Sequence, residues 1–188
     1  MRIINIPILF ILYAIGHGEA FSNQKTWSIE MKSVEVTTSN PDLMDFNGFK
    51  VSRVSRGLYA LSGNIVLNFE IIEGDANEME INMYYSSTGK NDYRALPFRI
   101  YRQHVIDILN SVYKEGAMEN FASCSNLPQF EDKFEPPLVK DTYYMDKCQF
   151  DESGFPNHAQ EGFYKIEVIG YGEVDWTMIL VFKLDADV

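Results

Sequence analysis

Residues 162–184 read "GFYKIEVIGYGEVDWTMILVFKL", and this stretch decides the fold class. In its first half Tyr164, Ile166 and Val168 recur with a period of two, which indicates a strand with one buried face. Gly170 and Gly172 then predict the turn of a hairpin. The second half is apolar on both sides over 178–182, as expected for a strand inside a sheet. Its aligned apolar set is Trp176, Met178, Leu180, Phe182 and Leu184.

Other stretches repeat this alternation. "TWSIEM" (26–31) places Trp27 and Met31 on one side, and Val34 then continues on the opposite parity, which predicts a bulge near residues 32–33. "NIVLNFEII" (64–72) and "MEINMYY" (79–85) flank an acidic turn and predict an antiparallel hairpin. Residues 50–61 indicate a further strand, with a less clear pattern.

One segment has a helical period instead. In "IYRQHVIDILNSVYKEG" (100–116) the apolar side chains of Tyr101, Val105, Ile108, Leu109 and Val112 recur at helical spacing. The pattern predicts an amphipathic helix that starts after Pro97 and ends at Gly116. The chain is therefore expected to be mainly β, an antiparallel β-sandwich or β-cup of about seven to eight strands with one amphipathic helix.

The N-terminus "MRIINIPILFILYAIGHGEA" predicts export. A positive start, a short apolar run over 3–15 and small residues at Gly18 and Ala20 are typical of a secretory signal peptide covering residues 1–20. The apolar run is interrupted by Asn5 and Pro7 and is too short for a spanning helix, which needs about 20 apolar residues. Residues 21–188 are then expected to form a single secreted, extracellular domain.

The net charge of −11 bears on partners. The acidic residues are spread along the chain, and no basic patch with interleaved aromatic residues occurs. Such a surface repels phosphate backbones and anionic bilayers. We expect neither a nucleic-acid partner nor stable membrane insertion.

Cys124 and Cys148 are the only cysteines. In an exported chain they are expected to form a disulfide, which would contribute on the order of 3 kcal/mol in the chain-entropy model. A zinc site would need two more ligands, and no C-x-x-C spacing occurs. No metal and no cofactor are expected.

The motifs of catalysis are absent from the sequence: there is no G-x-S-x-G, no glycine-rich phosphate loop and no H-E-x-x-H. His158 in "GFPNHAQEG" could act as a base, but an exposed loop histidine explains it better. "FDESGFP" (150–156) lacks the ligand spacing of a calcium loop. The sequence therefore predicts no catalytic residue and a protein that is not an enzyme.

The apolar faces are rich in large, adaptable side chains. The chain contains 13 Phe, 11 Tyr, 2 Trp and 8 Met residues, and methionine adapts to irregular partners. These faces could pack a filled core or line a cavity for a hydrophobic ligand, and patterning does not separate the two. The candidate ligand-binding residues are Met31, Phe69, Met79, Ile81, Met83, Trp176, Met178, Leu180 and Phe182.

The second half of the chain resembles a known family. The motifs C-S-N-L-P (124–128), P-P-L (136–138), Y-Y-M-D-K-C (143–148), G-F-P-N-H (154–158) and G-E-V-D-W (172–176) are similar to those of the CheB family of insect chemosensory proteins. That family is secreted, is associated with taste and contact-pheromone detection alongside degenerin-type sodium channels, and is distantly similar to the ganglioside-activator (MD-2-related) lipid-recognition proteins. The resemblance implies a non-enzymatic, hollow binder of lipids or cuticular-hydrocarbon pheromones.

Two functions remain open at this point. The first is a carrier of a hydrophobic small molecule. The second is an extracellular interaction protein with a packed core, which modulates a degenerin-type sodium channel or receptor through an exposed patch. Residues 124–148, here named the cysteine loop, run into a predicted strand, "TYYMDKCQF" (142–150). The loop would form either a rim over the cavity or that docking patch. Its candidate docking residues are Phe130, Phe134, Leu138 and Tyr143.

Overall fold

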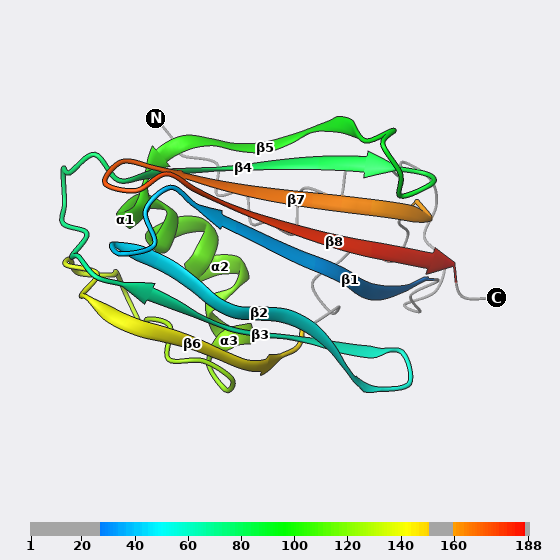
Figure 1. Ribbon diagram of the computed structural model, residues 1–188, viewed down its shortest axis with the longest axis horizontal. Helices are drawn as coiled ribbons and strands as arrows, with labels where there is room; N and C mark the ends of the chain where they lie inside the picture. The colour runs from blue at the N-terminus through cyan, green and yellow to red at the C-terminus, as the bar shows by residue number, and fades with distance from the viewer. Residues whose placement is uncertain (1–26, 151–159, 187–188) are drawn as a thin grey trace.

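The computed structural model describes residues 27–150 and 160–186, which form two antiparallel sheets. The five-stranded sheet has the order β1 (Trp27–Thr38), β8 (Trp176–Ala186), β7 (Gly162–Tyr171), β4 (Glu78–Ser86) and β5 (Arg94–His104). The three-stranded sheet has the order β2 (Met44–Ser55), β3 (Leu58–Leu67) and β6 (Asp141–Cys148). β1 lies beside β2, so the two sheets meet along this side (Figure 1). The predicted mainly β, sandwich-like fold is confirmed.

The helical segment follows β5 without a break. It consists of α1 (Val105–Ile108), the π-helical turn η2 (Leu109–Tyr113), α2 (Lys114–Gly116) and α3 (Met118–Phe121). Figure 1 shows these helices behind the sheets, at the end where the β1–β2 and β7–β8 connections lie. We call this end of the molecule the helical end.

Three sequence predictions are confirmed in detail. β7 and β8 form the expected hairpin, with Ile166 opposite Leu180. The register of β1 against β8 shifts between Met31 and Ser33, where the bulge was predicted. The strand at the end of the cysteine loop is β6.

The hairpin predicted from 64–72 and 79–85 is wrong. β3 ends at Leu67 and pairs with β2 and β6, whereas β4 belongs to the other sheet. The connection turns away because the Asn68 amide donates to Leu43 O and Ile71 pairs with Leu138. Alternation continued past the strand end because Leu67, Phe69 and Ile71 all pack into one core cluster.

Two boundaries were also wrong. Residues 50–61 are two strands, since β2 and β3 turn at Gly57, whose φ of +76° suits glycine. The helix begins at Val105 rather than after Pro97, because the chain from Arg94 to His104 pairs with β4. The His104 side chain accepts a hydrogen bond from the Ile106 amide and so marks the helix start.

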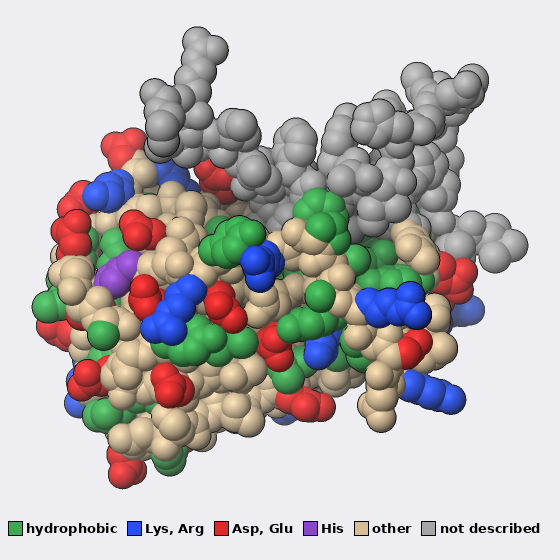
Figure 2. All heavy atoms as spheres, turned by 90° about the horizontal axis from the view of Figure 1, so that it is seen from above, with side chains coloured by type: hydrophobic (Ala, Val, Ile, Leu, Met, Phe, Trp, Pro, Cys, Tyr) green, Lys and Arg blue, Asp and Glu red, His purple; other side chains and the backbone are tan. Residues whose placement is uncertain are grey.

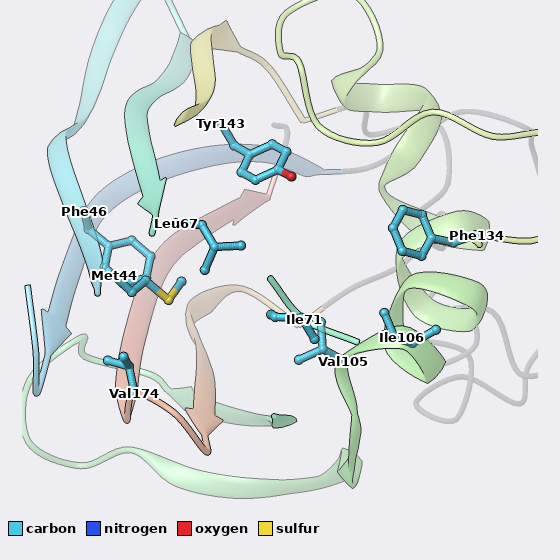
Figure 3. Packing of buried hydrophobic residues seen from close by; sticks show 9 residues of the cluster. All are labelled: Met44, Phe46, Leu67, Ile71, Val105, Ile106, Phe134, Tyr143 and Val174. Atoms are coloured by element: carbon cyan, nitrogen blue, oxygen red, sulfur yellow. The ribbon is translucent and has the colours of Figure 1, made fainter. Parts of the chain in front are cut away.

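The core is divided into clusters along the sandwich. The cluster at the helical end joins side chains of both sheets to side chains of the helices and the cysteine loop (Figure 3). In Figure 3 Phe134 lies on the side of the helices, whereas Leu67 and Tyr143 lie on the side of the sheets. Its buried members are Met44, Phe46, Leu67, Ile71, Val105, Ile106, Phe134, Tyr143 and Val174.

Two smaller clusters lie elsewhere in the described interior. One surrounds the disulfide and contains Met31, Leu61, Met145, Cys148, Leu180 and Phe182. The other contains Trp27, Tyr164 and Leu184.

Candidate functional site

The five-stranded sheet turns one face toward the other sheet and the helices, and we call this its inner face. Residues opposite one another in the register share a face. One row therefore runs Val34, Leu180, Ile166, Met83, and the next runs Val36, Met178, Val168, Ile81, Ile100. These rows form a continuous apolar surface across all five strands.

Burial is uneven across this surface. On β1 and β8 the side chains of Met31, Leu180 and Phe182 are 4%, 8% and 5% exposed and belong to a core cluster. On β4 and β7, Ile81, Met83 and Val168 are only half-buried. Ile81, Met83 and Val168 belong to none of the clusters that the described residues form. The apolar surface is therefore packed on the β1–β8 side and incompletely covered on the β4–β7 side.

The structure brings eight of the nine predicted ligand-binding residues onto this inner face. Met31, Leu180 and Phe182 are core residues, and Met178 packs against two clusters. Met79, Ile81, Met83, Met178 and Trp176 are half-buried. Phe69 is the exception, because it lies in the β3–β4 connection and packs against the cluster at the helical end.

Trp176 fits tightly against its own sheet. A Cβ atom on Gly170 would lie 2.0 Å from Trp176 Nε1, so the indole ring occupies the place of the missing side chain. The ring also lies 5.4 Å from the ring of Phe46, between centroids. Trp176 therefore closes the inner face toward the helical end.

A small hollow lies at the other end of the β1–β8 side. It has a volume of about 30 Å³ and is lined by Ile29, Met31, Gly57, Leu58, Tyr59, Phe150 and Phe182. This is close to the volume of one water molecule in the liquid, about 30 Å³. Met31 and Phe182 therefore line no space of ligand size in the described structure.

The cysteine loop is attached to the body at several points. Cys124 and Cys148 form the predicted disulfide, with their Cα atoms 5.3 Å apart. Asn126 donates to Thr142 O at 3.0 Å and accepts from the Tyr144 amide at 2.6 Å. Asn110 of the helical segment accepts from the Phe134 amide at 2.6 Å. The loop is therefore held by covalent and polar contacts along its length.

The aromatic residues of this loop point inward. Phe134 and Tyr143 are 9% and 6% exposed, and Phe130 and Leu138 are half-buried against the same cluster. Figure 3 shows Phe134 and Tyr143 on opposite sides of that cluster. The exposed patch expected from these four residues is absent, because they supply the core at the helical end.

A larger pocket lies where β4 and β5 lose their register, and the sequence analysis missed it. Asn82 pairs with Arg99 and Tyr84 with Ala95, so Met83 alone faces three residues of β5. Pro97 stands in this bulge, where its missing amide hydrogen removes a ladder donor. The pocket has a volume of about 390 Å³ and is lined by Asn82, Met83, Tyr84, Ala95, Leu96, Pro97, Arg99 and Tyr101. Pro97, within an otherwise strand-like stretch, was the feature of the sequence that could have indicated this bulge.

The polar groups around this pocket are arranged in pairs. The Arg99 guanidinium lies 4.2 Å from the centre of the Tyr101 ring, and Lys165 Nζ lies 4.2 Å from that of Tyr84. The Tyr84 hydroxyl donates to Glu167 at 2.9 Å. Burial, together with this carboxylate, raises the pKa of Tyr84. Tyr84 is therefore a neutral hydroxyl at physiological pH.

Asp75 and His104 form a second polar group, at the start of the helical segment. His104 Nε2 lies 2.8 Å from Asp75 Oδ1. Burial alone would raise the pKa of Asp75, but hydrogen bonds from Asn77, the Ile72 amide and His104 outweigh it and lower the pKa. Both ring nitrogens of His104 are engaged, since Nδ1 accepts from the Ile106 amide. The pair fixes the β5–α1 junction.

Some sequence predictions concern residues outside the described ranges. The signal peptide (1–20), His158 and most of the acidic stretch 150–156 belong to this group. Within residues 27–150 and 160–186 no helix has the length and apolar character needed to cross a bilayer. The same ranges contain no group of three or more His, Cys, Asp or Glu side chains placed to hold a metal ion.

Comparison with known proteins gives one family match. A family model described as "Protein of unknown function (DUF1091)" matches residues 79–166. The matched part runs from β4 through the β4–β5 bulge, the helices and the cysteine loop into β7. No curated protein matches the chain.

Proposed function

We propose that this chain is a secreted, non-enzymatic protein that binds a hydrophobic ligand such as a lipid or a cuticular hydrocarbon. The observation that carries the proposal is the inner face over β4 and β7. Ile81, Met83 and Val168 form part of a continuous apolar surface there, yet they remain half-buried and outside the core clusters. When a ligand covers apolar surface that the protein leaves exposed to water, the complex is stabilised by about 25 cal/mol per Å² of apolar surface buried.

Two further observations fit this proposal. The disulfide is typical of a protein that folds in an oxidising compartment, which agrees with export. The motifs of the cysteine loop and β7–β8 resemble the CheB family, and a role in taste or contact-pheromone detection follows from that resemblance. Non-covalent binding of a hydrophobic ligand needs no catalytic residue.

The alternative is an interaction protein that acts on a degenerin-type sodium channel or a receptor through its surface. It rested on an exposed apolar or aromatic patch formed by Phe130, Phe134, Leu138 or Tyr143. Phe134 and Tyr143 are buried instead, and the other two are half-buried. The large apolar side chains that this loop does expose are Val139 and Tyr144, at 47% each. The carrier is therefore the better supported of the two.

The test is the binding of an 18-carbon alcohol to the purified, disulfide-bonded protein, followed by native mass spectrometry and by displacement of a fluorescent apolar probe. The native protein should bind one long-chain molecule. Met83→Lys should abolish binding, since it places a charge on the inner face without removing a member of a core cluster.

Ile169→Lys is the matched control. Ile169 lies on the same sheet and is half-buried, but its cross-strand partner Glu80 places it on the opposite face from Met83. Circular dichroism should show both variants folded. Failure of the native protein to bind any long-chain ligand would rule out the carrier. Equal affinity of Met83→Lys and the native protein for the ligand would show that the ligand does not bind on the inner face.

A further inference from the structure

The pocket at the β4–β5 bulge has a chemistry of its own. Arg99 is the one charged residue among those that line it, and the others are apolar, aromatic or amide side chains. In the described part of the chain Arg99 forms no ion pair with a carboxylate. This unpaired cation belongs to a protein whose net charge is −11.

The geometry leaves the Arg99 donors available. The guanidinium carbon lies over the Tyr101 ring, 4.2 Å from its centre, and the Arg99 guanidinium N–H groups donate to no side-chain or backbone acceptor among the described residues. Two carboxylates on the same face of the sheet, Glu80 and Glu167, do not line the pocket. Glu167 accepts from the Tyr84 hydroxyl, and Glu80 accepts from the Asn82 amide at 3.1 Å. Arg99 is therefore the group in the pocket lining that can attract an anion.

Residues of both faces of the sheet line this pocket. Asn82, Tyr84 and Arg99 belong to the outer face, whereas Met83 pairs with Ile166 on the inner face. Leu96 packs on the inner side too, against the cluster of Trp27, Tyr164 and Leu184. Met83 and Leu96 nevertheless line the pocket, because three residues of β5 stand opposite one residue of β4 and the ladder is interrupted there.

The surroundings are accessible. Tyr101 is 69% exposed, and Pro97 and Arg99 are exposed as well. Figure 2 looks onto the side of the molecule where β5 lies, and hydrophobic side chains reach the surface there beside Lys and Arg side chains. A volume of about 390 Å³ is within the range of small-molecule sites, about 300–1,000 Å³.

We propose that this pocket holds the carboxylate of a long-chain fatty acid, with its chain running past Met83 and Leu96 onto the inner face. The inference rests on the proposed carrier function and specifies the ligand as a monoanionic amphiphile. Arg99 binds the carboxylate through paired N–H donors, and Tyr101 holds the guanidinium in place. The apolar inner face covers the chain.

The experiment compares two ligands with the same 18-carbon chain, oleate and oleyl alcohol, at pH 8 and below their aggregation concentrations. Arg99→Gln should weaken oleate binding by about 10- to 100-fold, the usual value of a charged hydrogen bond, and change oleyl alcohol binding less than about twofold. Arg99→Lys keeps the charge but not the paired donors, and should recover part of the lost affinity.

Arg102→Gln is the matched control. Arg102 lies on the same strand but pairs with Glu78 at 2.6 Å and does not line the pocket, so its loss should leave both affinities unchanged. If both ligands bind and Arg99→Gln affects them equally or not at all, the inference is overturned while the carrier function stands. If neither ligand binds the native protein, both proposals are overturned.

Discussion

The helical end and the β4–β5 side of the five-stranded sheet differ in how their inner side chains are covered. At the helical end Phe134 is 9% exposed. It belongs to a cluster made of side chains from both sheets, the helices and the cysteine loop. On the β4–β5 side Met83 and Phe98 are half-buried and belong to no such cluster within the described structure. One sandwich thus contains a sealed region and an incompletely sealed one.

The two regions differ because different elements pack against the inner face in each of them. The three-stranded sheet lies beside β1, and the helices and cysteine loop close the helical end. Among the described residues, the two core clusters that contain side chains of the three-stranded sheet include no side chain of β5 and only Met79 of β4. A sheet that is wider than its cover leaves apolar surface at one side, and stability and binding can then be located in different regions.

The largest expected effect is on stability at the helical end. Phe134→Ala should lower the free energy of unfolding by about 3–5 kcal/mol, since it removes a fully packed ring and leaves a cavity. Phe98→Ala on β5 should lower it by about 1–2 kcal/mol, because that ring already contacts solvent in part. Chemical denaturation measures both, and equal losses would contradict the division into two regions.

The disulfide should give the next largest effect. Replacing Cys124 and Cys148 together by Ser should lower the free energy of unfolding by about 3 kcal/mol, as the chain-entropy model gives for a separation of 24 residues. Hydrogen exchange should accelerate in β6, which ends at Cys148, and in α3, which ends three residues before Cys124, and remain unchanged in β4 and β7. Faster exchange throughout the five-stranded sheet would show that the two regions unfold as one unit.

The residues of the inner face were largely predictable from the sequence. Alternation over 162–184 and 79–85 placed the correct side chains on the inner face, because a strand shows a period of two wherever one face is buried. The predicted export signal and the presence of only two cysteines led to the prediction of the disulfide, since two thiols in an oxidising compartment have one pairing available.

Pairing between distant strands was not predictable. Residues 64–72 alternate in the same way whether β3 pairs with β4 or with β6, and only the contacts of Asn68 and Ile71 decide. The β4–β5 pocket was missed for a similar reason. The helical period of 100–116 begins at Tyr101 and led to a predicted helix that starts after Pro97, whereas residues up to His104 pair with β4, which overrides that local preference.

The pH dependence of the free energy of unfolding should show a smaller effect, which comes from two buried tyrosines that contact the cysteine loop. Burial raises the pKa of Tyr113 and of Tyr143 to about 12, and their hydroxyls donate to Pro128 O and Val139 O in the cysteine loop. Below pH 10 these groups are protonated in both folded and unfolded chains. Between about pH 10 and pH 12 only the unfolded chain loses the protons, so the free energy of unfolding should fall as pH rises.

The measurement is denaturation at a series of pH values from 8 to 12, with the double replacement of Tyr113 and Tyr143 by Phe as the control. That variant should be less stable at pH 8 but lose stability less steeply above pH 10. Burial also raises the pKa of Tyr164 in β7 to about 12, which leaves a residual slope in the variant. An unchanged slope would show that groups other than Tyr113 and Tyr143 cause the loss of stability above pH 10.

The smallest effect tests the polar attachment of the cysteine loop. Asn126→Ala removes one hydrogen bond to Thr142 O and one from the Tyr144 amide, and should lower the free energy of unfolding by about 1 kcal/mol because the site is exposed. Asn82→Ala on β4 removes only a contact with the neighbouring Glu80 side chain and should change stability by less than about 0.5 kcal/mol. Hydrogen exchange of the β6 amides should rise in the first variant alone. A larger loss of stability for Asn82→Ala would mean that the outer face of β4 contributes more to stability than the two hydrogen bonds between Asn126 and β6.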